Sequence, residues 1–158
     1  DRTTRVAQSS FMEASRPAAQ LPQEWLRGIL PERSGPAHTT LRLLPHCTER
    51  TNAPDSSRTW VEVFQRCGVA LQPVSTGCCG MAGTYGHEAR NRENSHALFA
   101  ASWAPALDTA KAATEAVATG YSCRSQAHRV AGARLRHPLS ALLDCIRAPA
   151  PRSPGVQD

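Results

Sequence analysis

The stretch VALQPVSTGCCG, residues 69–80, carries a short apolar run straight to two adjacent cysteines and a glycine. Two other apolar runs also end in a cysteine, TTLRLLPHC at 39–47 and AVATGYSC at 116–123. Between these runs the spacing predicts helices, at RTWVEVFQRCG (58–68) and from about Asn91 onward, where Leu98 and Ala101 are expected to face inward. Strands alternating with helices are typical of an α/β fold, with a mostly parallel sheet flanked by helices.

Four cysteines fall at the predicted carboxyl ends of these strands, and in a parallel sheet those ends share one edge, where functional groups gather. We therefore expect Cys47, Cys78, Cys79 and Cys123 to lie close together. Thiolates are soft ligands that select zinc, copper(I) or iron–sulfur clusters. Zinc sites usually use C-x(2–4)-C pairs, whereas here Cys78 lies 31 positions after Cys47 and Cys123 lies 44 positions after Cys79. Adjacent cysteines suit different irons of one cluster, and Gly80 would let the backbone turn closely against it.

The other two cysteines have a simpler explanation. Cys67 shares a helix face with Trp60 and Phe64, and Cys145 lies beside Ile146 on a predicted amphipathic helix. Free cysteine is among the most buried residue types, so we expect both to pack in the core.

Length and composition bound the organisation of the chain. Its 158 residues suit one core: we expect a helical lead-in and linker at 1–38, a cysteine-rich domain at 39–147 and a disordered tail at 148–158. The chain begins at Asp1, so we expect a piece of a longer polypeptide. Basic residues are dispersed and aromatic residues make up only 5%, so no nucleic-acid partner is predicted. No apolar run is long enough to span a membrane.

Three segments carry a family resemblance: HCTE at 46–49, GCCGMAGTYGHE at 77–88 and TGYSCRSQ at 119–126. They resemble the cysteine-rich CCG domain, which is found in heterodisulfide reductases and in the iron–sulfur subunits of glycolate and glycerol-3-phosphate dehydrogenases. The resemblance covers roughly residues 38–145. It is nearest to the C-terminal part of bacterial FAD/iron–sulfur dehydrogenases of D-2-hydroxy acids, of the D-2-hydroxyglutarate or D-lactate type.

The resemblance implies an iron–sulfur cluster, of the 4Fe–4S kind, on Cys47, Cys78, Cys79 and Cys123. It also implies FAD and ferredoxin-like domains upstream in the same polypeptide, and a quinone or electron carrier as acceptor. The fragment would relay electrons and would not itself be catalytic, because it contains no G-x-G-x-x-G or P-loop motif to hold a hydride-transfer cofactor. The expected location is cytoplasmic, either free or peripheral to the inner membrane.

Two departures from the family pattern, the residue at position 126 and a longer gap before Cys123, leave the cluster type open. The family usually ends in C-x-x-C, whereas Gln126 stands at the fourth position here. The sequence is compatible with a cubane cluster, a non-cubane cluster or a metal site with an open position. His46, Gly80, His87 and Gln126 are candidates for hydrogen-bonding neighbours of the cluster or, for the histidines, alternative ligands.

Two other kinds of function fit the same cysteines. One is a structural zinc module of the same enzyme. The other is a thiol–disulfide redox domain that cycles Cys78 or Cys79 with Cys123.

Overall fold

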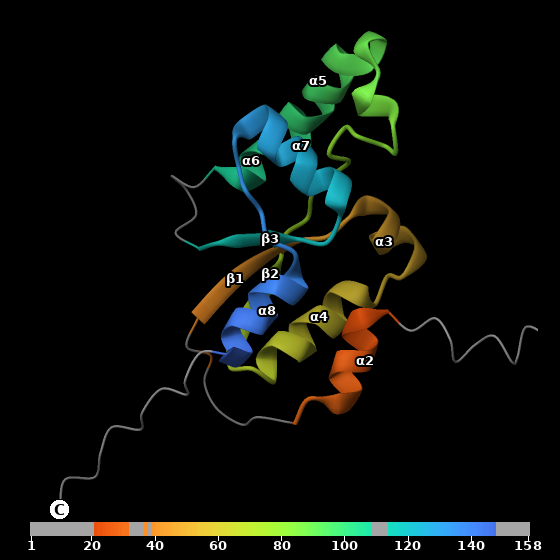
Figure 1. Cartoon of the computed structure of the whole chain (residues 1–158). Coiled ribbons are helices and arrows are strands. Elements are labelled where there is room, and N and C mark those ends of the chain that lie inside the picture. Colours follow the sequence, from red (N-terminus) through yellow and green to blue (C-terminus); the bar gives the residue numbers. More distant parts are fainter. Residues whose placement is uncertain (1–20, 32–36, 38, 109–113, 148–158) are drawn as a thin grey trace, which may run out of the picture.

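A parallel three-stranded sheet lies at the centre of the computed structural model, which describes residues 21–31, 37, 39–108 and 114–147 (Figure 1). The strand order is β2-β1-β3. The predicted α/β class, with a parallel sheet flanked by helices, is confirmed. The bounds of the strands are β1 Thr39–Leu44, β2 Val69–Pro73 and β3 Ala116–Ala118.

All three strands point the same way, so their carboxyl ends share one edge. Thr39 pairs with Val69 on one side of β1, and Leu44 pairs with Ala118 on the other. The strands are shorter than the apolar runs predicted. β1 stops before Pro45, which has no N–H to extend the ladder.

The cysteines consequently lie just beyond the strands rather than on them. Cys47 opens helix α3 (Cys47–Asn52), and Cys123 lies in the first turn of helix α7 (Tyr121–Ala131). The predicted strand 116–123 is therefore wrong in its second half, which is helical from Tyr121. Cys78 and Cys79 occupy the loop that follows β2.

Three helices cover one face of the sheet (Figure 1): α2 (Pro22–Ile29), α4 (Ser56–Gln65) and α8 (Pro138–Arg147). Trp60, Val63 and Phe64 of α4 are buried against the apolar side chains of β1 and β2. Cys67 and Cys145 are half-buried and pack at the margin of this first core.

The opposite face carries α5 (Arg92–Ser102), α6 (Ala104–Leu107) and α7, together with two short 3-10 turns, η2 (Tyr85–His87) and η3 (Ala89–Asn91). Cys79 and Cys123 belong to this second core, beside Met81, Phe99 and Trp103. The site thus lies between the carboxyl edge of the sheet and this helical layer.

The orientation predicted for α5 is wrong. Leu98 and Ala101 are exposed, whereas Ser95, Phe99 and Trp103 face inward at four-residue intervals. The buried face of α5 includes a polar residue, Ser95. A prediction based on the spacing of apolar residues therefore does not identify it as the inward face. Ser95 is buried because it has a hydrogen-bond partner across the core.

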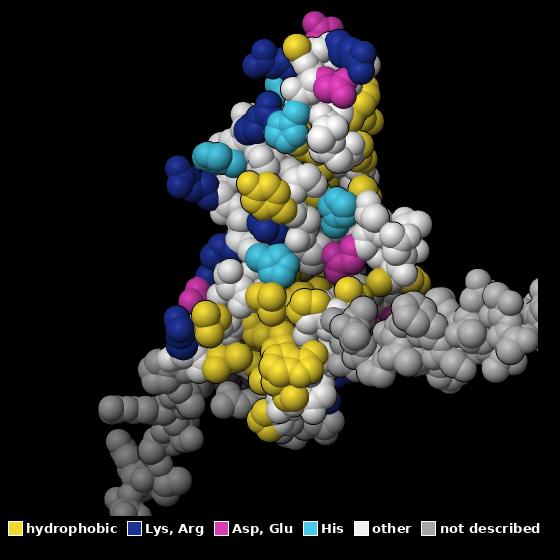
Figure 2. Space-filling model, turned by 45° about the vertical axis from the view of Figure 1, so that its right-hand side comes forward, with side chains coloured by type: hydrophobic (Ala, Val, Ile, Leu, Met, Phe, Trp, Pro, Cys, Tyr) yellow, Lys and Arg dark blue, Asp and Glu magenta, His cyan; other side chains and the backbone are white. Residues whose placement is uncertain are grey.

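Helix α2 lies within the segment predicted as a lead-in, and it packs against α4. Five large hydrophobic side chains are exposed on α2 and α8, and hydrophobic side chains gather over that part of the surface in Figure 2: Trp25, Ile29, Leu139, Leu143 and Ile146. In the described ranges no helix combines the length and the hydropathy that crossing a bilayer requires. The helix-compatible segment at 5–15 and the predicted tail at 148–158 lie outside the described residues.

Candidate functional site

The side chains of the four predicted cysteines come together from three separate segments. The Cys78 thiol lies close enough to Cys47 to interact with it, and the Cys79 thiol interacts with those of Cys78 and Cys123. Cys123 also feels the charge of Cys47. The four sulfurs therefore form one connected group.

The pKa values of the four-cysteine group reflect thiols that share hydrogen bonds, so that one thiolate is stabilised while its neighbours keep their protons. The pKa of Cys79 is lowered to about 7, chiefly because the Cys123 thiol donates a hydrogen bond to its thiolate. The pKa of Cys123 is raised because it donates that bond and because it is buried. Burial also raises the pKa of Cys78, although the Gly80 N–H partly offsets this. A bound cation or cluster would remove this difference by stabilising all the thiolates together.

The turn that carries Cys78 and Cys79 is tight. Gly80 has a φ of +89°, and its N–H points at Cys78 Sγ, 3.3 Å away. A side chain at Gly80 would also collide with the backbone carbonyl of Ser95. Glycine is required at this position both for conformation and for space.

Helix α5 holds the backbone of this turn. Ser102 Oγ donates to the Cys78 carbonyl at 2.7 Å, and Trp103 Nε1 donates to the Gly77 carbonyl at 3.1 Å. Arg50 of α3 donates to the Thr76 carbonyl at 2.5 Å, which ties the helix of Cys47 to the same loop.

Cys123 is positioned by the start of α7. Arg124 donates to the carbonyls of Ala118 and Thr119, both at 2.9 Å, and so fixes the first turn of the helix to the end of β3. A Cβ built on Gly120 would come within 2.8 Å of Cys123 Sγ and 2.5 Å of His46 Cδ2.

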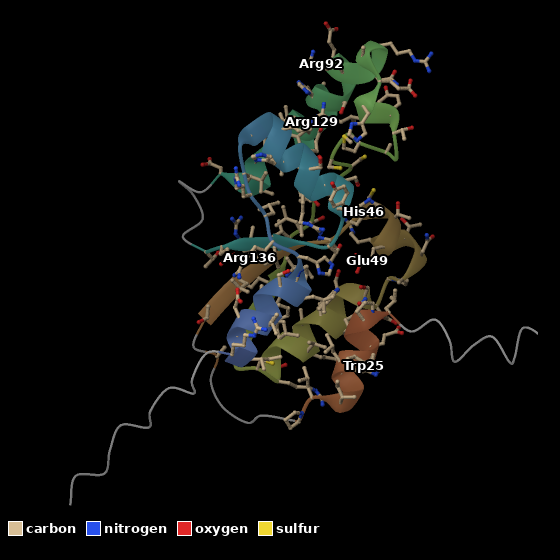
Figure 3. The ribbon with its side chains drawn as sticks, viewed as in Figure 1. Trp25, His46, Glu49, Arg92, Arg129 and Arg136 are labelled. Atoms are coloured by element: carbon tan, nitrogen blue, oxygen red, sulfur yellow. The ribbon has the colours of Figure 1, made fainter. Side chains whose placement is uncertain are left out.

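The predicted neighbours of the thiols have different surroundings. The ring of His46 shares the space around Gly120 with Cys123, and in Figure 3 His46 lies between α3 and the start of α7. His87 lies farther along the loop, where its Nδ1 accepts a hydrogen bond from Arg129 at 3.2 Å. That nitrogen is therefore occupied by a protein donor. Gln126 is buried and donates to Ser95 Oγ.

One buried polar atom beside the site has no partner. Thr76 Oγ1, two residues before Cys78, is buried and makes no hydrogen bond within the described part of the chain. Buried hydroxyls are nearly always bonded, so this one needs an explanation, and an absent water or ion is among those that apply.

Sequence reasoning missed several residues that build the site: Thr76, Ser95, Ser102, Trp103 and Gly120. Gly120 and Thr76 are close in sequence to predicted ligands, so a search of the flanking residues could have found them. Ser95 and Ser102 of α5, and Trp103 directly after it, act through contacts that link positions distant along the chain. Across residues 21–31, 37, 39–108 and 114–147, no three His, Cys, Asp or Glu side chains are placed to hold a single metal ion.

Three curated relatives are each named D-2-hydroxyglutarate dehydrogenase. The chain is 53% identical over 127 residues to the protein of Pseudomonas putida, a match that covers 80% of this chain and 12% of the relative. It is 47% identical over 131 residues to that of Pantoea ananatis and 46% identical over 131 residues to that of Escherichia coli. These two matches again cover 80% of this chain, and 12% and 13% of the relatives.

No family model matches the chain, and no solved structure does. The chain spans about an eighth of the length of the curated relatives it matches. At 46–53% identity over most of its own length, it is homologous to a segment of proteins named D-2-hydroxyglutarate dehydrogenase.

Proposed function

We propose that this chain is the iron–sulfur electron-transfer domain, of the CCG type, of an FAD-linked dehydrogenase of D-2-hydroxy acids. The substrate class follows the name of the relatives, D-2-hydroxyglutarate dehydrogenase. FAD would bind elsewhere in the same polypeptide, and a quinone or carrier protein would accept the electrons.

The observation that carries this proposal is the convergence of Cys47, Cys78, Cys79 and Cys123 at the carboxyl edge of the sheet. The residues fit such a group chemically. Four soft thiol donors converge, and the Gly80 N–H already donates to one sulfur. The hydroxyl of Thr76, two residues before Cys78, has no partner among the described residues and is available as a further donor. N–H and O–H donors around cluster sulfurs are one of the ways a protein sets a reduction potential.

When bound, a cluster supplies one-electron transfer between the flavin and the acceptor. The protein's own residues hold and enclose it. Cys79 and Cys123 are almost fully buried, whereas Cys47 and Cys78 are half-buried. The site is therefore closed towards the second core and open on the side of Cys47 and Cys78, which is the side on which an electron partner could approach.

A thiol–disulfide function is the second candidate, and one observation favours it. The Cys79 thiolate is stabilised by the Cys123 thiol, and such a pair is poised for oxidation. Exchange with oxidised glutathione would join the two sulfurs in a disulfide: the glutathione disulfide bond breaks, and its two sulfurs leave as thiols that carry the proton of Cys123 and one proton from solvent.

Replacement of each of the four cysteines by serine tests the first candidate. After anaerobic reconstitution of the 158-residue chain with iron and sulfide, each variant should lose visible absorbance and the EPR signal seen after dithionite reduction. Cys67→Ser is the matched control, because Cys67 packs at the margin of the other core. Full retention of the signal in all four variants would overturn the cluster proposal. Loss in the control alone would also contradict it.

A further inference from the structure

A buried hydrogen bond joins the helix of Cys123 to the helix that holds the cysteine turn. Gln126 Nε2 of α7 donates to Ser95 Oγ of α5 at 2.9 Å. The two residues are 1% and 0% exposed. Gln126 is three residues after Cys123, so both side chains lie on the same buried side of α7.

At the other end of this bond, Ser95 is part of the support of the turn. Its carbonyl and hydroxyl groups fill the space beside Gly80, where a Cβ would meet them within 3.0 Å. Its hydroxyl also lies against Gly86, at 2.7 Å from a Cβ built there. Farther along α5, Ser102 holds the Cys78 carbonyl. The turn is therefore both packed against α5 and hydrogen-bonded to it.

We infer that Gln126 is a positioning residue of the thiol site: through Ser95 it fixes α7 against α5 and so sets the separation between Cys123 and Cys79. The inference rests on the proposed function for its consequence, the geometry offered to a cluster. The role assigned to Gln126 is this contact with Ser95 and not ligation.

We expect loss of this hydrogen bond to affect the geometry of the thiol site more than the stability of the fold. One neutral hydrogen bond makes only a small net contribution to the stability of a folded domain, because unfolding replaces it with bonds to water. Residues that orient ligands change metal affinity by about 10- to 100-fold. Breaking the bond should therefore leave a folded protein with an altered cluster.

The test compares Gln126→Met, Ser95→Ala and the double variant with the unmodified chain. Methionine keeps the length and packing of glutamine and lacks the amide donor. Gln23→Met is the matched control: Gln23 Nε2 donates to Ser56 Oγ at 2.6 Å, and that pair is also buried, between α2 and α4. Ser56 keeps its bond to Glu49 in this control.

Each 158-residue chain is reconstituted anaerobically with iron and sulfide. Iron retained against a chelator and the EPR spectrum after dithionite reduction are then measured. Both single variants should shift the g values and lower iron affinity by about 10-fold or more. The double variant should lose no more iron affinity than either single variant, since the two single variants and the double variant all lack the same hydrogen bond. Gln23→Met should keep the unmodified spectrum, and circular dichroism should show all the variants folded.

An unmodified chain that forms no cluster would overturn the proposed function and this inference with it. A chain that forms a cluster whose spectrum and iron affinity are unchanged in Gln126→Met and Ser95→Ala would overturn the inference alone. An equal spectral shift in Gln23→Met would also overturn it, because the effect would then be one of general stability. Should Gln126→Met fail to fold, Ser95→Ala, the smaller truncation, decides the question.

Discussion

Replacing Gly120 by alanine adds one methyl group at the point where His46 and Cys123 meet. The new Cβ would lie 2.5 Å from the His46 ring and 2.8 Å from Cys123 Sγ, whereas ordinary contacts begin at 3.4 Å. The sulfur must therefore retreat by about 0.6 Å and the ring by about 0.9 Å. Gly120 has φ −74° and ψ 126°, which any residue adopts, so the substitution acts through space alone.

The size of the effect differs between the metal-free and the loaded protein. Overpacking of this kind costs about 1–3 kcal/mol in folding free energy. Metal–ligand distances tolerate only about 0.2 Å, which is less than the displacement required of the sulfur. Gly120→Ala should therefore lower the urea midpoint of the metal-free protein and should abolish most iron binding.

The control for this variant is Gly28→Ala, on helix α2, where nothing lies within 4 Å of the new Cβ. It should raise helix stability by about 0.5–1 kcal/mol and leave iron binding unchanged. Adding His46→Ala to Gly120→Ala should recover part of the stability and none of the iron, because the clash with Cys123 persists. Equal urea midpoints and equal iron contents for Gly120→Ala and Gly28→Ala would refute the reasoning.

Three further substitutions test other parts of the structure. Gly80→Ala should destabilise the protein by about 1–3 kcal/mol more than Gly83→Ala in urea unfolding, because both glycines have positive φ but only Gly80 lacks room for a Cβ; equal losses would contradict this. Thr76→Val should stabilise the metal-free protein by about 1 kcal/mol, since it removes an unpaired buried hydroxyl. It should also lower the reduction potential of the cluster-loaded protein, because a hydrogen-bond donor is lost. A lower stability together with a higher reduction potential would rule out the donor role of Thr76. Burial lowers the pKa of His137, whose Nδ1 accepts the N–H of Leu139 at the start of α8. The unfolded chain therefore takes up the proton first, and stability falls as pH drops through about 6.5. His137→Asn, which caps without titrating, should flatten the urea midpoint between about pH 7.5 and pH 5.5, and an unchanged slope would exclude His137 as the cause.

The α/β class and the parallel sheet could be predicted from the sequence, because apolar runs of strand length alternate with helical spacing. The ends of the strands could not. Pro45 stops β1 before Cys47, and the chain turns into helix at Tyr121, before Cys123. The sequence pattern used to predict each strand continues past these residues, whereas the hydrogen bonds between the strands do not.

The candidate site divides in the same way. The four cysteines could be singled out because they follow apolar runs, and their role as ligands stays a prediction. The residues that position the cysteines could not be predicted from the sequence, because they act in pairs such as Gln126 with Ser95. These two residues are polar and lie 31 positions apart. A buried polar pair has no periodic signature. It becomes visible only when both helices are placed.

The most direct test of the central claim is the iron and acid-labile sulfide content of the 158-residue chain, purified and handled without oxygen. We expect a brown protein with iron and sulfide in equal amounts, bound in fixed proportion to the chain, and loss of both in Cys79→Ser. A colourless protein that contains neither, with or without zinc, would contradict the claim.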